Sequence, residues 1–176
     1  DFQPDEATRI LASDGSEIGS FYMKNRRLIR VGDMPRHLID AFVAVEDQRF
    51  YQHTGVDVRR VAGAVLANLQ ARRFAQGFST ITMQLARNTY SDLLPRTERT
   101  LTRKIREIRV ARQIEKAFSK EEILERYLNT IFLGAGAYGV EAAARAYFGV
   151  PASNLTPAQS ALLAAMPKAP STTNPY

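Results

Sequence analysis

Residues 33–55 read DMPRHLIDAFVAVEDQRFYQHTG, and this stretch decides the fold class. Asp33 is a preferred residue type for a helix N-cap, and Pro35 suits the first turn of a helix. The apolar side chains that follow recur at helical spacing, which gives one face made of Leu38, Ile39, Phe42 and Val45. The stretch therefore predicts an amphipathic helix that ends near Glu46 and buries one face in a core.

Helical periods recur along most of the remaining chain. Four residues are expected to cap further helices: Asp57, Ser79, Ser119 (in a capping box with Glu122) and Thr156 (in one with Gln159). A longer helix across residues 96–116 is expected to bury Leu101, Ile105, Ile108 and Ile114. Near the N-terminus, Asp14-Gly15 between short apolar runs predicts a small β-hairpin. The expected fold class is mainly α with a short N-terminal hairpin.

Composition excludes several kinds of function. The chain of 176 residues has no cysteine, which excludes disulfides, thiolate metal sites and a cysteine nucleophile. The longest apolar runs, residues 41–45 and 161–166, are far shorter than the roughly 18 residues of a membrane span. The first residues lack the pattern of a secretion signal, so any targeting segment is expected to have been removed or never present.

The positive charge is concentrated in one segment. Residues 96–116, the basic strip, contain eight basic and three acidic side chains, which accounts for nearly all of the net charge of +6. Such a strip favours an anionic partner such as a phosphate, a nucleic acid or a lipid headgroup. The alternative is an ordinary solvated helix face.

Three segments carry residue types suited to chemistry. Residues 46–55 place two adjacent carboxylates at the edge of a core, where desolvation can raise a pKa and suit a general acid or base; a solvated turn after a helix is the alternative. Residues 77–84 place hydroxyls at an expected helix N-terminus, which favours anions, unless Ser79 merely caps the helix. Residues 103–107 place two cations beside Glu107 on one helix face, as a diphosphate clamp or an ordinary surface ion pair would.

Two weaker signals do not lead to a site. Gly134, Gly136 and Gly139 match GxGxxG, but a capped helix precedes them instead of the strand that a dinucleotide site needs. His37 and His53 are far apart and have no carboxylate at ligand spacing, which argues against a histidine metal site.

Four segments together resemble the motifs of glycosyltransferase family 51, the peptidoglycan glycosyltransferases. In chain order they are EDxxFxxHxG at 46–55, GxSTITxQ at 77–84, RKxxE at 103–107 and KxxILExYLN at 120–129. The stretch 136–149 is also similar, so the resemblance covers roughly residues 10–176. The family occurs as monofunctional enzymes and as the N-terminal catalytic domain of bifunctional penicillin-binding proteins.

The resemblance implies a lysozyme-like helical fold with a small membrane-facing lobe at residues 56–76. Residues 1–32 would form the hairpin and a linker, and residues 33–176 the catalytic domain. An amphipathic segment with arginines suits a lipid interface, although a core helix has the same pattern. The family's last motif, an arginine pair that follows the region of resemblance, is absent from this sequence, so the catalytic domain is expected to be C-terminally incomplete.

The resemblance also implies a reaction, the polymerisation of lipid II into β-1,4 glycan strands. Glu46 would be the general base that takes the proton from the 4-hydroxyl of the acceptor GlcNAc as this oxygen attacks C1 of the donor MurNAc. The attack inverts that carbon and releases undecaprenyl diphosphate. Glu107 would be the second catalytic carboxylate. Substrate contacts are implied for Asp47, Arg49, Phe50, His53, Ser79, Thr80, Thr82, Gln84, Arg87, Arg99, Arg103 and Lys104.

Four of these cations, Arg87, Arg99, Arg103 and Lys104, would stabilise the leaving diphosphate, alone or with a divalent cation, Mg²⁺ or Mn²⁺. No organic cofactor is implied. The implied partners are lipid II, the growing lipid-linked glycan, the membrane surface and a fused transpeptidase domain or other cell-wall synthesis proteins, with no nucleic acid. The implied location is the outer face of the bacterial cytoplasmic membrane. Phe78 and Met83 depart from the family pattern, and either could narrow the donor site.

Two other functions also agree with part of the sequence. A lysozyme-like hydrolase or lytic transglycosylase shares the fold and the acidic residue but cleaves glycan, and a neutral glycan does not need the basic strip. A nucleic-acid-binding module would explain the basic strip but not the segments at 46–55 and 77–84.

Overall fold

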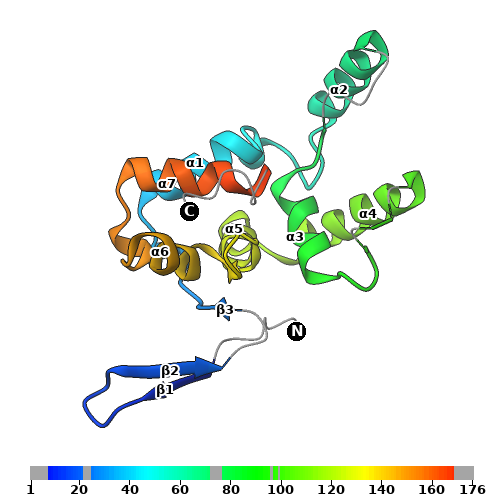
Figure 1. The fold of residues 1–176 in the computed structure, drawn as a ribbon. Helices are drawn as coiled ribbons and strands as arrows, with labels where there is room; N and C mark the ends of the chain where they lie inside the picture. Colours follow the sequence, from blue (N-terminus) through cyan, green and yellow to red (C-terminus); the bar gives the residue numbers. More distant parts are fainter. Residues whose placement is uncertain (1–7, 22–24, 72–76, 96, 99, 169–176) are drawn as a thin grey trace.

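The computed structural model describes residues 8–21, 25–71, 77–95, 97–98 and 100–168. In this part of the chain the expected mainly α fold is confirmed (Figure 1). The helices are α1 (Arg36–Glu46), α2 (Val58–Ala71), α3 (Ile81–Thr89), α4 (Leu101–Ala117), α5 (Lys120–Thr130), α6 (Val140–Phe148) and α7 (Pro157–Ala165). The strands are β1 (Thr8–Leu11), β2 (Glu17–Phe21), β3 (Asn25–Arg26) and β4 (Ala137–Tyr138). Short 3-10 turns are η1 (Val31–Asp33), η2 (Phe50–Gln52), η3 (Ala152–Asn154) and η4 (Met166–Lys168).

The core lies where α1 packs against α7 and α3 packs against α4 and α5. The apolar face predicted for α1 supplies much of it, because Leu38 and Phe42 are fully buried and Ile39 nearly so. Phe42 meets Tyr127 of α5 edge to face, with ring centroids 6.3 Å apart. Packing in the core therefore fixes the orientation of α1 up to its last residue, Glu46.

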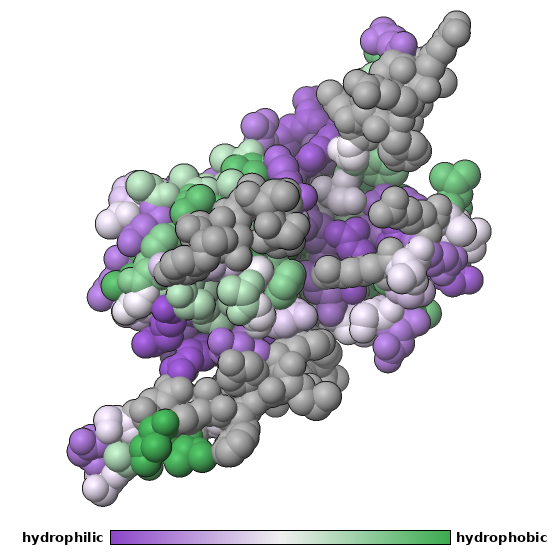
Figure 2. Space-filling view, in the orientation of Figure 1, coloured by the Kyte–Doolittle hydropathy of each residue, from purple (hydrophilic) through white to green (hydrophobic). Residues whose placement is uncertain are grey.

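Two elements project from this body (Figure 1). Strands β1 and β2 pair antiparallel and confirm the predicted hairpin. Apolar side chains lie exposed on it at Ile10, Leu11 and Ile18 (Figure 2). Helix α2 projects on another side and exposes Val58 and Leu66. Within the described residues, no helix combines the length and apolar character that crossing a membrane requires.

The capping predictions are partly confirmed. Both capping boxes form, at Ser119 with Glu122 and at Thr156 with Gln159. Two other predicted caps are wrong. Asp33 lies in the turn η1, and α1 begins after Pro35 without a side-chain cap. Helix α3 is capped by Thr80, whose hydroxyl accepts from Met83 N–H, so Ser79 stays available for another partner.

The buried face predicted for α4 is confirmed at Ile114 but wrong at Leu101 and Ile105. Leu101 is 83% exposed and Ile105 52% exposed, whereas Glu107, Ala111 and Ile114 face inward. The carboxylate of Glu107 is fully buried because three cationic groups surround it, and their charges compensate for the lost solvation. Charge pairing therefore sets the rotation of this helix about its axis. Hydrophobic periodicity alone does not predict such pairing.

The loop between α5 and α6 explains the three glycines of the GxGxxG match. Gly134, Gly136 and Gly139 all adopt positive φ. Gly139 starts α6 at φ 87° and donates its N–H to Ile131 O, and a Cβ there would lie 2.8 Å from Asn129 O. Asn129 in turn accepts from Ile29 N–H, which holds the chain before α1 against α5. All three glycines therefore serve a backbone with positive φ, and Gly139 also allows a close approach to Asn129.

We expect Gly139→Ala to lower the free energy of unfolding by about 2–4 kcal/mol, because the added methyl combines an unfavourable positive φ with a backbone clash. Gly136→Ala is the matched control, since Gly136 has φ 71° but a methyl added there would meet nothing within 4 Å. It should cost only about 1 kcal/mol. Urea denaturation measures both, and equal losses would show that the contact with Asn129 is not the cause.

Candidate active site

A cavity of about 1020 Å³ lies between α3, α4 and the end of α5. Five of the residues predicted from the sequence line it: Ser79, Gln84, Arg87, Arg103 and Lys104. The rest of its lining is Gly77, Phe78, Asn88, Thr100, Leu101, Ile131, Phe132 and Pro167. The cavity thus combines a cationic side with an apolar one, as a ligand with an anionic group and a hydrocarbon part requires.

Glu107 organises the cationic side of the cavity. Its Oε2 accepts from Arg103 Nη1 at 2.9 Å, and its Oε1 accepts from Lys104 Nζ at 3.1 Å, with Arg87 Nη1 at 3.6 Å from Oε1. Lys104 also donates to the Ser79 hydroxyl at 2.9 Å. Burial lowers the pKa of Lys104, and the nearby charge of Glu107 opposes that shift. One carboxylate thus gathers three cations and leaves a net positive surface facing the cavity.

Glu46 lies at the end of α1 and joins the cavity through Gln84. Its Oε2 accepts from the Gln84 amide at 2.7 Å, and its Oε1 is buried without a hydrogen-bond partner among the described residues. The Gln84 carbonyl accepts from the Tyr127 hydroxyl at 3.4 Å. Burial raises the pKa of Tyr127 well above its usual value, and the charge of Glu46 adds to this, so the hydroxyl remains a donor. A carboxylate oxygen without a hydrogen-bond partner can accept a proton.

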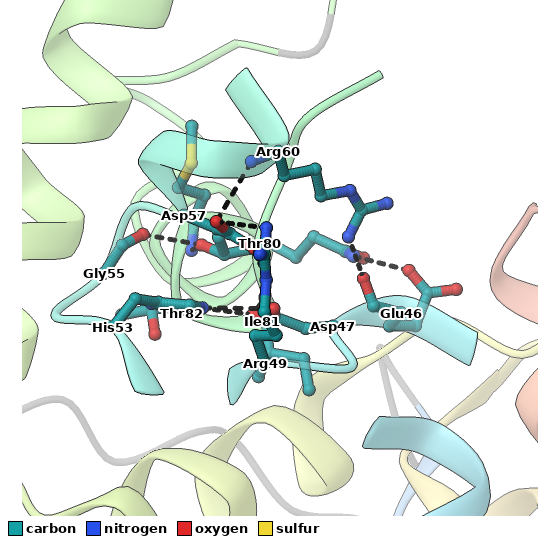
Figure 3. A network of polar contacts seen from close by, with 12 residues as sticks. Glu46, Asp47, Arg49, His53, Gly55, Asp57, Arg60, Thr80, Ile81 and Thr82 are labelled. Carbon is teal, nitrogen blue, oxygen red and sulfur yellow. Dashed lines mark hydrogen bonds and ion pairs between the residues drawn. The ribbon is translucent and has the colours of Figure 1, made fainter. Parts of the chain in front are cut away.

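Asp47, the neighbour of Glu46, has a different environment. It is 1% exposed and accepts from His53 Nε2 at 3.0 Å and from Ile81 N–H at 3.1 Å (Figure 3). Because a carboxylate only accepts, His53 carries its proton on Nε2. The bond to Ile81 reaches the first residue of α3. Asp47 and His53 therefore hold the loop after α1 against α3, and neither lines the cavity.

Arg49 and Asp57 form a second polar unit beside Glu46. Two guanidinium nitrogens of Arg49 donate to the two oxygens of Asp57 at 2.8 and 2.7 Å. Asp57 also accepts from Arg60 N–H at 3.0 Å and so caps α2, as the sequence predicts. Burial alone would raise the pKa of Asp57, but these hydrogen bonds and the Arg49 charge outweigh it and lower the pKa. Figure 3 shows the hydrogen bonds that join Arg49, Asp57 and Arg60.

Three further predicted site residues lie in packed positions. Thr80 donates to Gly55 O at 2.7 Å, and Thr82 donates to Glu115 at 2.6 Å. Phe50 is fully buried, with the ammonium of Lys120 4.3 Å from its ring centroid. These side chains hold the loop and the helices together and do not line the cavity. Arg99 lies outside the described residues.

The two departures from the family pattern have different surroundings. Phe78 lines the cavity, and the Lys104 ammonium lies 4.7 Å from its ring centroid, within the range of a cation–π contact. Met83 is fully buried and does not line the cavity, so the expectation that it could narrow the site does not fit its position.

Sequence reasoning missed two polar contacts of the site. Tyr127 has the helical spacing of a core residue, and that spacing gives no sign that its hydroxyl reaches Gln84. Arg60 is indistinguishable in the sequence from Arg59 on the polar face of α2, yet its Nη1 donates to Glu46 O at 2.6 Å. Both contacts join residues far apart in the chain, which no local pattern reports.

The described His, Asp and Glu side chains do not form a set of ligands for a divalent cation held by the protein. Among the described residues, no three His, Asp or Glu side chains converge as metal ligands. Both oxygens of Glu107 face cationic side chains, which would repel a metal ion. The stabilisation of an anionic ligand in the cavity is therefore assigned to the cationic side chains.

Comparison with known proteins agrees with the motifs. The profile of the Transglycosylase family matches residues 14–176. Penicillin-binding protein 2D of Bacillus subtilis (strain 168) is 49% identical over 175 residues, covering 99% of this chain and 25% of that protein. Penicillin-binding protein 1A of Aquifex aeolicus (strain VF5) is 46% identical over 173 residues, covering 98% of this chain and 23% of that protein. The chain thus spans about a quarter of the length of these relatives.

A solved structure, that of penicillin-binding protein 1A from Haemophilus influenzae at 2.6 Å resolution, is 28% identical with a TM-score of 0.45, covering 99% of this chain and 16% of that one. The family profile spans nearly the whole chain, with the four motifs in order inside it. The chain therefore belongs to the Transglycosylase family, glycosyltransferase family 51, which confirms the family that its motifs resemble.

Proposed function

We propose that the chain is a peptidoglycan glycosyltransferase domain that polymerises lipid II into β-1,4 glycan strands with inversion at MurNAc C1. The observation that carries the proposal is the pairing of Glu46, through Gln84, with a cationic cavity. A synthase of this kind needs a base for the acceptor hydroxyl and positive charge for the departing diphosphate. Both are present and joined by one hydrogen-bonded amide.

Glu46 is the general base in this proposal. Gln84 binds its Oε2, which leaves Oε1 to take the proton of the acceptor 4-hydroxyl as that oxygen attacks C1 of the donor. The C1–O bond to the diphosphate breaks as the new glycosidic bond forms, so the undecaprenyl diphosphate leaves with the electron pair of that bond.

Arg87, Arg103 and Lys104 bind the diphosphate in this proposal. All three line the cavity and are oriented by Glu107. Positive groups fixed before the reaction stabilise the charge that grows on the leaving group without reorganising. A neutral glycan offers no such charge, which favours a synthase over a lytic enzyme.

The membrane surface supplies the substrate in this proposal, at the outer face of the cytoplasmic membrane. Helix α2 exposes Val58 and Leu66, and α4 exposes Leu101 and Ile105, with Leu101 also lining the cavity. Exposed apolar side chains suit a lipid interface, and Leu101 would bring one of them to the cavity that receives the polyprenyl-linked substrate. In this proposal α2 is part of the small membrane-facing lobe expected at residues 56–76, of which residues 72–76 lie outside the described part. A transpeptidase domain fused to this one is a further proposal.

We expect Glu46→Gln to lower lipid II polymerisation by about 10²–10⁴-fold, because the variant keeps the hydrogen-bonding shape but loses the base. The assay follows glycan chains longer than a disaccharide in detergent. Asp40→Asn is the control, since Asp40 is an exposed carboxylate on the same helix, paired with Arg36. Cleavage of preformed glycan without polymer synthesis would favour the lytic alternative instead.

We expect Lys104→Met to lower kcat/KM for lipid II by about 10²-fold, since it removes a positive group from the site of the growing charge. Lys116→Met removes the same charge from an exposed position of the same helix and should stay close to the parent. Inhibition by a polyprenyl diphosphate measures the affinity for the leaving group. An unchanged inhibition constant in Lys104→Met would argue against a diphosphate contact.

A further inference from the structure

We propose that Arg60 is a positioning residue for Glu46. Through Arg60, the position of helix α2 relative to α1 controls where the general base lies. The inference rests on the proposed function, in which Glu46 takes a proton from the acceptor. Its basis is a hydrogen bond between the first turn of α2 and the last residue of α1.

The contact acts on the peptide group that carries the base. Arg60 Nη1 donates to Glu46 O at 2.6 Å (Figure 3). Carbonyls in the last turn of a helix lack partners within the helix, and a cation there also meets the negative end of the helix dipole. Asp47, the next residue, leaves the helix at φ −156° and ψ 73°. The guanidinium therefore holds the chain where the helix ends and the base is attached.

Arg60 is itself held in place. Its N–H donates to Asp57 Oδ1 at 3.0 Å, and Asp57 is 5% exposed and bound by two nitrogens of Arg49. A continuous chain of hydrogen bonds thus runs from Arg49 through Asp57 and Arg60 to the carbonyl of Glu46. The Asp57 carboxylate pairs with the guanidinium of Arg49 and binds Arg60 through its backbone N–H. The guanidinium of Arg60 binds the carbonyl of Glu46 instead.

The side chain of Glu46 depends on this support. Its carboxylate receives one hydrogen bond, from Gln84 of α3, while Oε1 has no partner. Arg60 therefore constrains the backbone and Gln84 the carboxylate. Displacing a reacting group by about 1 Å can cost about 10²-fold in rate. Since α2 projects from the body, a shift of α2 relative to α1 would act on Glu46 through Arg60.

Arg59 and Arg60 provide a matched pair of variants. They are adjacent in the first turn of α2 and carry the same charge, but Arg59 is exposed. We expect Arg60→Ala to lower kcat for lipid II by about 10–100-fold and to change KM by less than about threefold. Arg59→Ala should leave kcat within about twofold, because any loss of attraction to lipid acts on binding.

A conservative variant separates positioning from general support of the fold. Arg60→Lys keeps one charged donor for the carbonyl and should restore kcat to within about fivefold of the parent. Thermal unfolding establishes that each variant is folded at the assay temperature. If Arg60→Ala does not fold, Arg60→Gln takes its place, because its side chain is polar but too short to reach the carbonyl. The same loss of kcat is expected from it.

Glu46→Gln, measured alongside, separates this inference from the proposed function. If Glu46→Gln polymerises like the parent, the proposed function itself is wrong. If Glu46→Gln is inactive but Arg60→Ala matches Arg59→Ala in kcat, only the role of Arg60 is overturned. A loss in Arg60→Ala confined to KM, or an Arg60→Lys variant as slow as Arg60→Ala, overturns it as well.

Discussion

The carboxylate of Asp47 is the contact on which the arrangement of the site depends. It accepts a hydrogen bond from the first backbone N–H of α3 and another from His53 in the loop that follows α1. Asp47 is 1% exposed, so water cannot replace a lost donor. If one of the two donors were lost, the buried charge would keep only part of its compensation. The two bonds therefore fix α1, the loop and α3 relative to one another. Since Glu46 ends α1 and Gln84 lies on α3, their contact follows from that constraint.

The adjacent carboxylates of Glu46 and Asp47 show how one motif supplies both structure and chemistry. Both side chains are buried, so burial does not separate them. Both oxygens of Asp47 contact donors, whereas Glu46 has one oxygen without a partner. A fully bonded carboxylate holds the fold, and a partly bonded one can take up a proton. The difference arises because successive residues at the end of a helix point in different directions, so Asp47 meets His53 and the first N–H of α3, whereas Glu46 meets the Gln84 side chain.

Local signals in the sequence predicted much of the fold. The hairpin at Asp14-Gly15, the face of α1 and both capping boxes depend on residues a few positions apart, and the structure confirms them. The rotation of α4 was not predictable in this way, because the partners of Glu107 include Arg87 on another helix. Thr80 replaces Ser79 as the cap of α3 for a similar reason. Thr80 also bonds Gly55 O, and Lys104 binds Ser79, so contacts from elsewhere decide between two hydroxyls that are equally suitable caps.

The candidate site was predictable as a set of residues but not as a set of roles. Ser79, Gln84, Arg103 and Lys104 occur in the motifs and Arg87 follows one of them by three residues, and all five line the cavity. Asp47, His53, Thr80 and Thr82 occur in the same motifs, yet they bind backbone and side chains within the protein. A motif records which residue types are needed near a site, whereas a role depends on which atoms remain without partners once the chain has folded. In the proposed function the reacting groups are Glu46 Oε1 and the three cations paired with Glu107, and the other polar residues fix the positions of these groups.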